Sequence, residues 1–547
     1  MHAVQVAAIR DLRIHNYIEM ISVVILWWDH IISFPLEVTS IWKRPKTLIS
    51  WIYLVNRYLA SISRIAFFVI NWEKLSNSVF YTFLKLHTCK TTSLLNQILL
   101  FFNQAMICLL LLIRVYAIYA RDRRILYLFA TMCTVMLTAT ILSLVKQRSS
   151  MQTRLSGCKL AHTESNAIRL AVPWECMLVY DAVVLLLTII KTYSLAATRA
   201  KVSLATNGVH IPTIVLRDGI LYFVGITVSN AINIMFFYYP PPLLKGALST
   251  LNSVINITLV SRMVLNLRDS ATQSEVETQV TAQSWGNLNF ASRGTFRDMQ
   301  LETVLDISRA ALATKRHPAS DNWSDIIESD STRIIGPSRL HNYVQIVSVV
   351  ILWWDHIVSF PLEVTSIWKR PKTLVSWIYL VNRYVASIGN VAFFVTDWEK
   401  LSDELALVKQ DSSTPTNLPG CKLAHTTQNA IRLAVPWECM FVYDAVVLIL
   451  TVHKTYRLAA SRAKASLTPN GVHIPTIILR DGVLYFIGMT VSNALNILCF
   501  YITPPLLKGG LSTFNSVIDI TLVSRLVLNL RDLATRPEIE TQGTQQV

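Results

Sequence analysis

Long apolar runs, separated by charged or proline-containing turns, are the feature that most restricts how this 547-residue chain can fold. A helix needs about 20 apolar residues to cross a bilayer, and runs of that length recur along the chain. Only helices and closed barrels satisfy their backbone in lipid, and the sequence lacks the ten-residue alternation of barrel strands. The runs therefore predict an all-α, polytopic transmembrane helix bundle in the plasma membrane or an endomembrane.

Composition agrees with a protein whose main partner is the lipid bilayer. Apolar residues make up 52% of the chain, charged residues 15%, and the mean hydropathy is +0.42. Soluble domains usually carry about 25% charged residues. We assign the net charge of +16 to basic loops beside the membrane rather than to a nucleic-acid-binding face, so no nucleic-acid partner is expected.

An internal repeat divides the chain into two tandem copies. Residues 15–73 recur at 341–399 with 47 of 59 positions identical, and residues 157–269 recur at 420–532 with 89 of 113 identical. The second copy lacks 63 residues of the first, and this stretch includes two apolar runs. The repeat therefore predicts about seven spans followed by about five.

The expected organisation follows from the repeat and the apolar runs. It comprises an N-terminal tail (1–14), the first membrane copy (15–269), a polar linker (270–335), the second copy (336–532) and a polar C-terminal tail (533–547). The spans of the first copy are predicted at about 17–38, 48–70, 94–119, 125–145, 171–190, 212–238 and 243–265. Those of the second copy are predicted at about 343–364, 374–396, 434–453, 475–501 and 506–528.

The odd number of spans in the first copy creates a conflict about orientation. Because the linker holds no run long enough to cross, the second copy would begin on the opposite side and insert upside down. Either the copies are inverted repeats, as in some transporters, or two neighbouring duplicate genes were joined, in the cell or in a gene model. We favour the second explanation.

Basic residues do not decide the orientation, because both sides of the first copy carry nearly equal numbers. The tight clusters at Lys43-Arg44 and Arg121–Arg124 favour an outside N-terminus. A glycosylation sequon at Asn322 in the linker provides a test, because a glycan there would place the linker outside and reverse this orientation.

Polar side chains inside the predicted spans are the candidate functional residues, because ionisable groups are costly in a bilayer. Asp29 and Arg57 fall near the midplane of adjacent spans, about a dozen and nine residues from the same face, so we expect an ion pair with His30 beside it. The other candidates are Asp181, Asn230, Asn233 and Asn256 in the first copy, and Asp355, His356, Arg383, Asp444, Asn493 and Asn496 in the second.

Two explanations of these polar residues stay open. They form a pocket for a ligand or a proton relay, or they make the interhelical hydrogen bonds that hold the bundle together, which we favour. Glu37 and Trp42 lie near the predicted membrane edge beside Lys43 and Arg44. We interpret them as an interfacial anchor.

The first two spans resemble a membrane domain of unknown function that is widespread in mushroom-forming (basidiomycete) fungi. The segments that carry the resemblance are Trp28-Asp29-His30, Glu37–Trp42 and Asn56-Arg57-Tyr58, with Trp28 at a position where the family usually has Tyr. Further similar stretches lie at 112–121, 174–181, 216–219 and 261–269. The resemblance implies a seven-span, receptor-like protein, and it implies no specific activity.

Two cysteines of the first copy are candidates for a disulfide. Cys89 precedes the third span and Cys158 lies between the fourth and fifth. With the N-terminus outside, both would face the oxidising side and tether that loop, as in many seven-span receptors. The second copy keeps Cys421 but lacks the segment that would hold its partner.

Motifs of known chemistry are missing from the sequence. It contains no Gly-rich phosphate-binding loop, no His-Glu-x-x-His pair and no Gly-x-Ser-x-Gly elbow, so we expect no enzyme activity, no metal centre and no cofactor. A receptor-like or sensory protein, with an unknown small ligand and a cytosolic signalling partner, is the favoured function. A small-solute transporter with about twelve spans is the alternative.

Overall fold

The computed structural model describes residues 2–71, 89–145, 150–152, 160–202, 211–286, 330–398, 413–415, 423–425, 427–464, 474–505 and 507–544. The helices of the first copy are α1 (His2–Glu37), α2 (Leu48–Asn71), α3 (Cys89–Ile118), α4 (Arg123–Val145), α5 (Glu164–Val202), α6 (Ile211–Tyr238) and α7 (Ser249–Gly286). The helices of the second copy are α9 (Asp330–Glu363), α10 (Leu374–Trp398), α11 (Thr427–Lys464), α12 (Ile474–Ile502) and α13 (Ser512–Thr544).

Helices thus lie at all twelve positions where the sequence predicts spans, and the chain is a multi-span membrane protein. Ten of those described are long and apolar enough to cross a bilayer. The other two, α7 and α10, have their counterparts α13 and α2 among these ten, with most residues shared. We therefore assign all twelve helices to the membrane bundle.

Several helices extend beyond the predicted spans. The first, α1, begins at His2 and so includes the segment assigned to the N-terminal tail. At the other end of each copy, α7 continues to Gly286 and α13 to Thr544. Two small antiparallel ribbons precede α5 and α11: β1 (Ser150–Gln152) pairs with β2 (Leu160–His162), and β3 (Ser413–Pro415) pairs with β4 (Leu423–His425).

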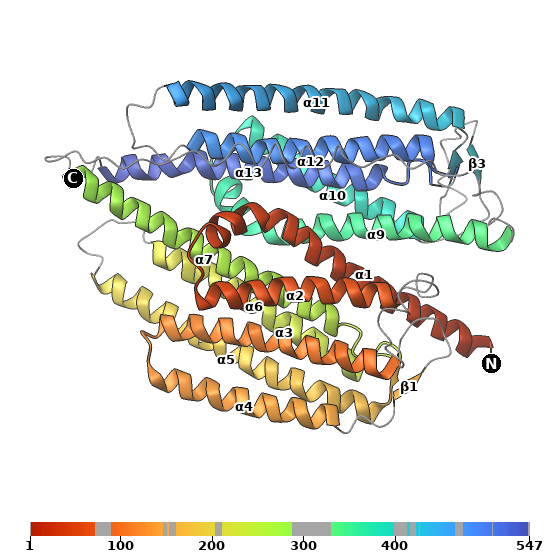
Figure 1. Cartoon of the computed structure of the whole chain (residues 1–547), viewed down its shortest axis with the longest axis horizontal. Coiled ribbons are helices and arrows are strands. Elements are labelled where there is room, and N and C mark those ends of the chain that lie inside the picture. Colours follow the sequence, from red (N-terminus) through yellow and green to blue (C-terminus); the bar gives the residue numbers. More distant parts are fainter. Residues whose placement is uncertain are drawn as a thin grey trace.

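The two copies lie side by side and run in the same direction (Figure 1). Tyr17 of α1 and Tyr343 of α9 are equivalent residues, and their rings meet edge to face with centroids 5.6 Å apart. The inverted arrangement that the odd span count would impose is therefore wrong. Instead, α7 ends at one end of the bundle and α9 begins at the other.

The apolar core is continuous between the copies. Its largest cluster of buried side chains includes Leu26 and Trp28 of α1 and their equivalents Leu352 and Trp354 of α9. It also takes in residues of α3, α5, α6, α7, α12 and α13. The contact between α1 and α9 is thus part of the packed interior.

Oxidative cross-linking tests the parallel packing of the copies. Photo-oxidation of the purified chain is expected to join Tyr17 to Tyr343 as dityrosine, because their rings touch. The linked peptide pair is identified by mass spectrometry, and it should vanish in the Tyr17→Phe variant. Inverted copies would place the two rings at opposite faces of the membrane, so wild-type chain that never yields this pair would contradict the packing.

Parallel packing brings basic turns of both copies to the same end of the bundle. The turns at 43–46, 121–124 and 369–372 follow α1, α3 and α9, which all run the same way (Figure 1). Each turn carries at least two Lys or Arg residues. This distribution favours that end as the cytosolic one, and α7 and α13 also finish there.

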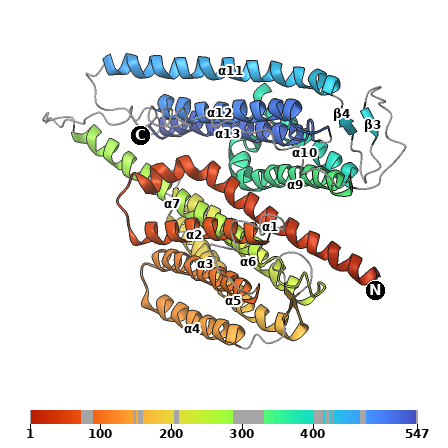
Figure 2. The same cartoon turned by 45° about the vertical axis from the view of Figure 1, so that its right-hand side comes forward.

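The second copy lacks counterparts of α3 and α4, and this exposes α11. In the first copy, the Tyr180 hydroxyl donates to the Cys108 carbonyl at 2.6 Å and its ring packs on Phe129, with centroids 5.0 Å apart. Tyr180 is 0% exposed, whereas its equivalent Tyr443 in α11 is 69% exposed. Figure 2 shows α4 and α11 at opposite outer edges of the molecule.

A pair of equivalent glycines tests the packing of α3. A Cβ on Gly219 of α6 would clash with the Arg114 guanidinium, whereas one on Gly482 would meet no described atom nearer than Leu526 Cδ1 at 3.8 Å. Gly219→Ala would push the buried Arg114 guanidinium away from the Phe223 ring, which lies 5.1 Å below it. We expect a loss of about 1–3 kcal/mol of stability, measured as a lower melting temperature of the purified chain.

The Gly482→Ala variant is the matched control. Alanine there removes a flexible helix glycine without a clash, so stability should be unchanged or about 0.5–1 kcal/mol higher. Equal losses of stability in both variants would show that Arg114 of α3 does not pack closely against Gly219 of α6.

Candidate functional site

A π-helical turn at the end of α1 forms one wall of the principal polar cluster. Residues Val38–Trp42 (η1) follow α1 directly, after Pro35 near its end. A π-turn brings residues five apart into register, and Trp42 Nε1 donates to Glu37 Oε1 at 3.0 Å. Lys46 closes the turn by donating to the carbonyls of Ile41 and Trp42 at 2.5 and 3.0 Å.

Four charged side chains from α1, α2 and α7 meet beside this turn; we call them the ionic cluster (Asp29, Glu37, Arg57 and Arg262). Arg57 lies between both carboxylates, with Nη1 3.5 Å from Asp29 Oδ2 and Nε 3.1 Å from Glu37 Oε2. Arg262 Nε lies 2.5 Å from Asp29 Oδ1. The Asp29–Arg57 pair expected from the sequence is therefore present, within a larger network.

The ionic cluster is buried and its charges balance. Asp29 and Glu37 are 0% exposed and Arg57 is 1% exposed. Two carboxylates and two guanidiniums sum to zero, which reduces the cost of holding them in a low-dielectric interior. The cluster ties α7 to both α1 and α2.

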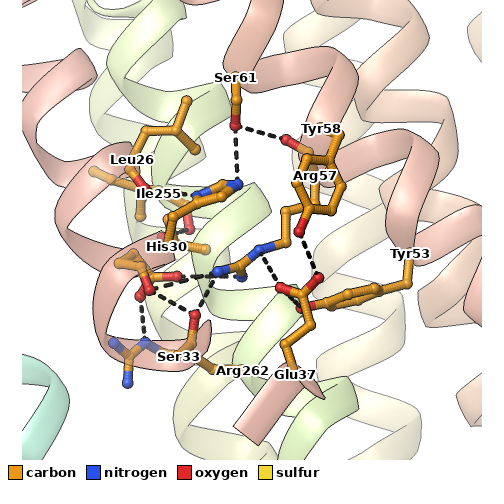
Figure 3. Close-up of polar contacts among 12 residues, drawn as sticks. Leu26, His30, Ser33, Glu37, Tyr53, Arg57, Tyr58, Ser61, Ile255 and Arg262 are labelled. Carbon is orange, nitrogen blue, oxygen red and sulfur yellow. Dashed lines mark hydrogen bonds and ion pairs between the residues drawn. The ribbon is translucent and has the colours of Figure 1, made fainter. Parts of the chain in front are cut away.

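Glu37 is the residue whose predicted role is wrong. The sequence predicts an interfacial anchor, yet Glu37 is fully buried and accepts hydrogen bonds from three aromatic side chains. Besides Trp42, the Tyr53 hydroxyl donates to Oε2 at 3.2 Å and the Tyr58 hydroxyl to Oε1 at 2.9 Å (Figure 3). The π-turn that follows Glu37 brings Trp42 back to its carboxylate, which spacing alone does not reveal.

His30 and two serines extend the cluster along α1 and α2. His30 Nδ1 lies 2.8 Å from the Leu26 carbonyl, and Nε2 lies 2.9 Å from Ser61 Oγ (Figure 3). Arg57 Nη2 donates to Ser33 Oγ. His30 therefore lies beside the ion pair, as expected, and its ring bonds to α2 rather than to Asp29.

The second copy repeats the ionic cluster with the same partners. Arg383 lies 3.6 Å from Asp355 and 3.0 Å from Glu363, and Arg525 Nε lies 2.5 Å from Asp355. His356 Nε2 lies 2.9 Å from Ser387 Oγ. The cluster therefore forms without α3 and α4.

A second group of polar residues lies between α5, α6 and α7; we call it the amide cluster (Asp181, Asn230, Asn252 and Asn256). Asn230 Nδ2 donates to Asp181 Oδ2, and Asn230 Oδ1 accepts from Asn252 Nδ2 at 2.6 Å and from Asn256 Nδ2 at 3.4 Å. All four residues are at most 2% exposed. Asn233 lies outside this network and accepts from Ser249 Oγ at 3.3 Å.

The amide cluster of the second copy differs at one position. Asn493 Nδ2 donates to Asp444 Oδ2 at 2.5 Å, and Asn515 Nδ2 donates to Asn493 Oδ1 at 2.6 Å. Asp519 stands where the first copy has Asn256, and it accepts from Asn515 at 3.3 Å. Asn496 accepts from Ser512 Oγ at 3.3 Å, as Asn233 does from Ser249.

α7 contributes to both clusters from different faces. Asn252 and Asn256 are four residues apart and share the face towards α5 and α6. Arg262, six residues and about 9 Å further along, faces α1. One helix therefore links the two buried polar networks.

Sequence reasoning missed three contributors: Arg262, Asn252 and Asp519. The four-residue spacing of Asn252 and Asn256 was a usable signal, because it places both side chains on one helix face. Arg262 falls within the predicted seventh span, and no local pattern identifies its partner on α1.

Two sequence predictions fall outside what the structure describes. Cys158 and the side chain of Cys89 lie there, so the disulfide stays a prediction, and so does the sequon at Asn322. Within the described ranges, no group of three or more His, Cys, Asp or Glu is placed to hold a metal.

Comparison with known proteins identifies one domain. Residues 17–62 and 343–388 each match a family described as a family of unknown function (DUF6533). The matches cover α1 to α2 and α9 to α10, and so include Asp29, Glu37 and Arg57 of the ionic cluster with their equivalents. No curated protein and no solved structure matches the chain.

Proposed function

We propose that the first copy is a receptor-like, signal-transducing unit, akin to the seven-span fungal membrane proteins that the sequence resembles. The observation that carries this proposal is the position of α7. Its inner half joins both buried polar clusters, and its outer half continues as a polar helix to Gly286. A rearrangement of either cluster would therefore shift α7, including its far end.

The outer half of α7 is long enough to serve as an output element. Residues 267–286 are helical, a length of about 30 Å at 1.5 Å per residue. They project past the ends of α2, α3 and α4 in both views (Figures 1 and 2). The basic turns at this end favour a cytosolic location, where a signalling partner would bind.

Arg262→Gln tests the proposal, because it removes the ion pair between α7 and α1 while Asp29 keeps Arg57. A biotin ligase fused to the C-terminus, which lies at the same end, would label neighbouring cytosolic proteins in cells. A receptor-like unit should show a reproducible difference in labelled proteins between the variant and wild type. Asp122→Asn, a change in the exposed α3–α4 turn, is the matched control.

The transporter alternative predicts a different result. Proteoliposomes of the purified chain would take up solutes from a defined mixture of amino acids, sugars and nucleosides, detected by mass spectrometry. Uptake above empty liposomes, together with an unchanged labelling pattern in Arg262→Gln, would overturn the receptor-like proposal.

We further propose that the chain is a fusion of two tandem duplicate genes. Parallel copies, with α7 ending at one end of the bundle and α9 beginning at the other, suit two units that evolved to insert separately. A transcript spanning codons 270–335 would show that one polypeptide is made. Two separate transcripts would show that the units are independent proteins.

A further inference from the structure

The amide cluster contains a buried carboxylate without a counter-charge. Asp29 has two guanidiniums within 3.5 Å, whereas the described residues offer no basic partner to Asp181. Asp181 is 2% exposed and its Oδ2 accepts from Asn230. An isolated carboxylate in a low-dielectric interior is costly, so a positive species must accompany it.

Side-chain oxygens of α5 and α7 in this region are unpaired, one of them on Asp181 itself. Asp181 Oδ1, Asn256 Oδ1 and Ser253 Oγ are buried and have no hydrogen-bond partner in the part of the chain that the structure describes. Asn256 belongs to the same network through Asn230, and Ser253 is three residues before it, on the same side of α7. These are carboxylate, amide and hydroxyl oxygens, the ligands that hard cations prefer.

We propose that Asp181, Asn256 and Ser253 form a binding site for a small monovalent cation, Na⁺, at the centre of α5, α6 and α7. A proton on Asp181 would only neutralise the carboxylate, whereas a cation would be coordinated by the carboxylate, amide and hydroxyl oxygens together. One cation also balances the single negative charge of the cluster. This inference goes beyond the receptor-like function and stands independently of it.

The one substitution in the amide cluster of the second copy supports the assignment of a cation site. Asp519 replaces Asn256 and so keeps a side-chain oxygen at that position while adding a negative charge. Within the described ranges, Asp519 Oδ1 and Asn515 Oδ1 are buried without partners. Basic partners are again lacking for Asp444 and Asp519 among the described residues, so this site should attract a cation more strongly.

Thermal unfolding of the purified full chain tests the site, with Na⁺ itself as the probe. Melting temperatures are compared in NaCl, KCl and N-methylglucamine chloride at equal ionic strength and pH. Because a ligand that binds only the folded state stabilises it, NaCl should raise the midpoint by several degrees, in a saturable manner. The double variant Asp181→Asn/Asp444→Asn should reduce the Na⁺-specific shift, because it removes the carboxylate of the first site and leaves only Asp519 in the second.

Two further variants keep the test decisive if the double variant is poorly folded. Asn256→Asp, which copies the second site into the first, should lower the Na⁺ concentration needed for half of the shift. Asp122→Asn, in the exposed turn, should leave the shift unchanged. Equal midpoints in all three salts would overturn the proposal, and a dependence on pH alone would identify a proton site instead.

Discussion

Replacing Asp29 with Asn is expected to destabilise the first copy by about 3–5 kcal/mol, because the buried Arg57 would keep only Glu37 and the partly buried Arg262 would lose its carboxylate partner on α1. Arg57 is 1% exposed and cannot reach water to regain its hydration. The loss should appear as a lower melting temperature and a smaller monodisperse peak in size-exclusion chromatography of the detergent-solubilised chain.

The double variant Asp29→Asn/Arg57→Gln is the control for charge balance. It leaves Glu37 and Arg262 as one negative and one positive group, so it should be more stable than Asp29→Asn alone. Asp355→Asn in the second copy should cause a loss similar to that of Asp29→Asn, because the contacts there are equivalent. If the single and double variants are equally unstable, charge pairing does not hold α1, α2 and α7 together.

Replacing Glu37 with Gln is expected to lower the stability by about 2–4 kcal/mol. The donors around Glu37 bond both oxygens of its carboxylate, whereas the carboxamide of Gln has only one acceptor oxygen. Tyr53 bonds one carboxylate oxygen, and Tyr58 and Trp42 bond the other. Arg57 also loses one of its two carboxylates. The measurement is again the melting temperature, with Glu363→Gln as the equivalent change in the second copy.

Trp42→Phe distinguishes the role of Glu37 as a buried hydrogen-bond acceptor from that of an interfacial anchor. Trp42 is 49% exposed and gives the cluster one hydrogen bond, so its loss should cost about 1 kcal/mol. An anchor would depend mainly on the indole at the membrane edge. A larger loss in Trp42→Phe than in Glu37→Gln would therefore restore the anchoring interpretation.

Helix positions were predictable because the bilayer leaves the backbone no alternative to helices or closed barrels. The lengths of the apolar runs alone located α1 to α7 and α9 to α13. The shortened second copy was located by its sequence identity to the first copy. The Asp29–Arg57 pair was also predictable, since adjacent antiparallel spans place residues of equal depth side by side.

The sequence by itself thus determined the class of protein, the repeat and the positions of the predicted polar residues along their helices. Only the tertiary structure decided which faces meet. Burial of Glu37 depends on a π-turn, the second partner of Asp29 comes from α7, and the parallel copies depend on α1 packing against α9. Depth along a helix follows from counting residues, whereas the neighbours of a side chain depend on how distant helices rotate and pack.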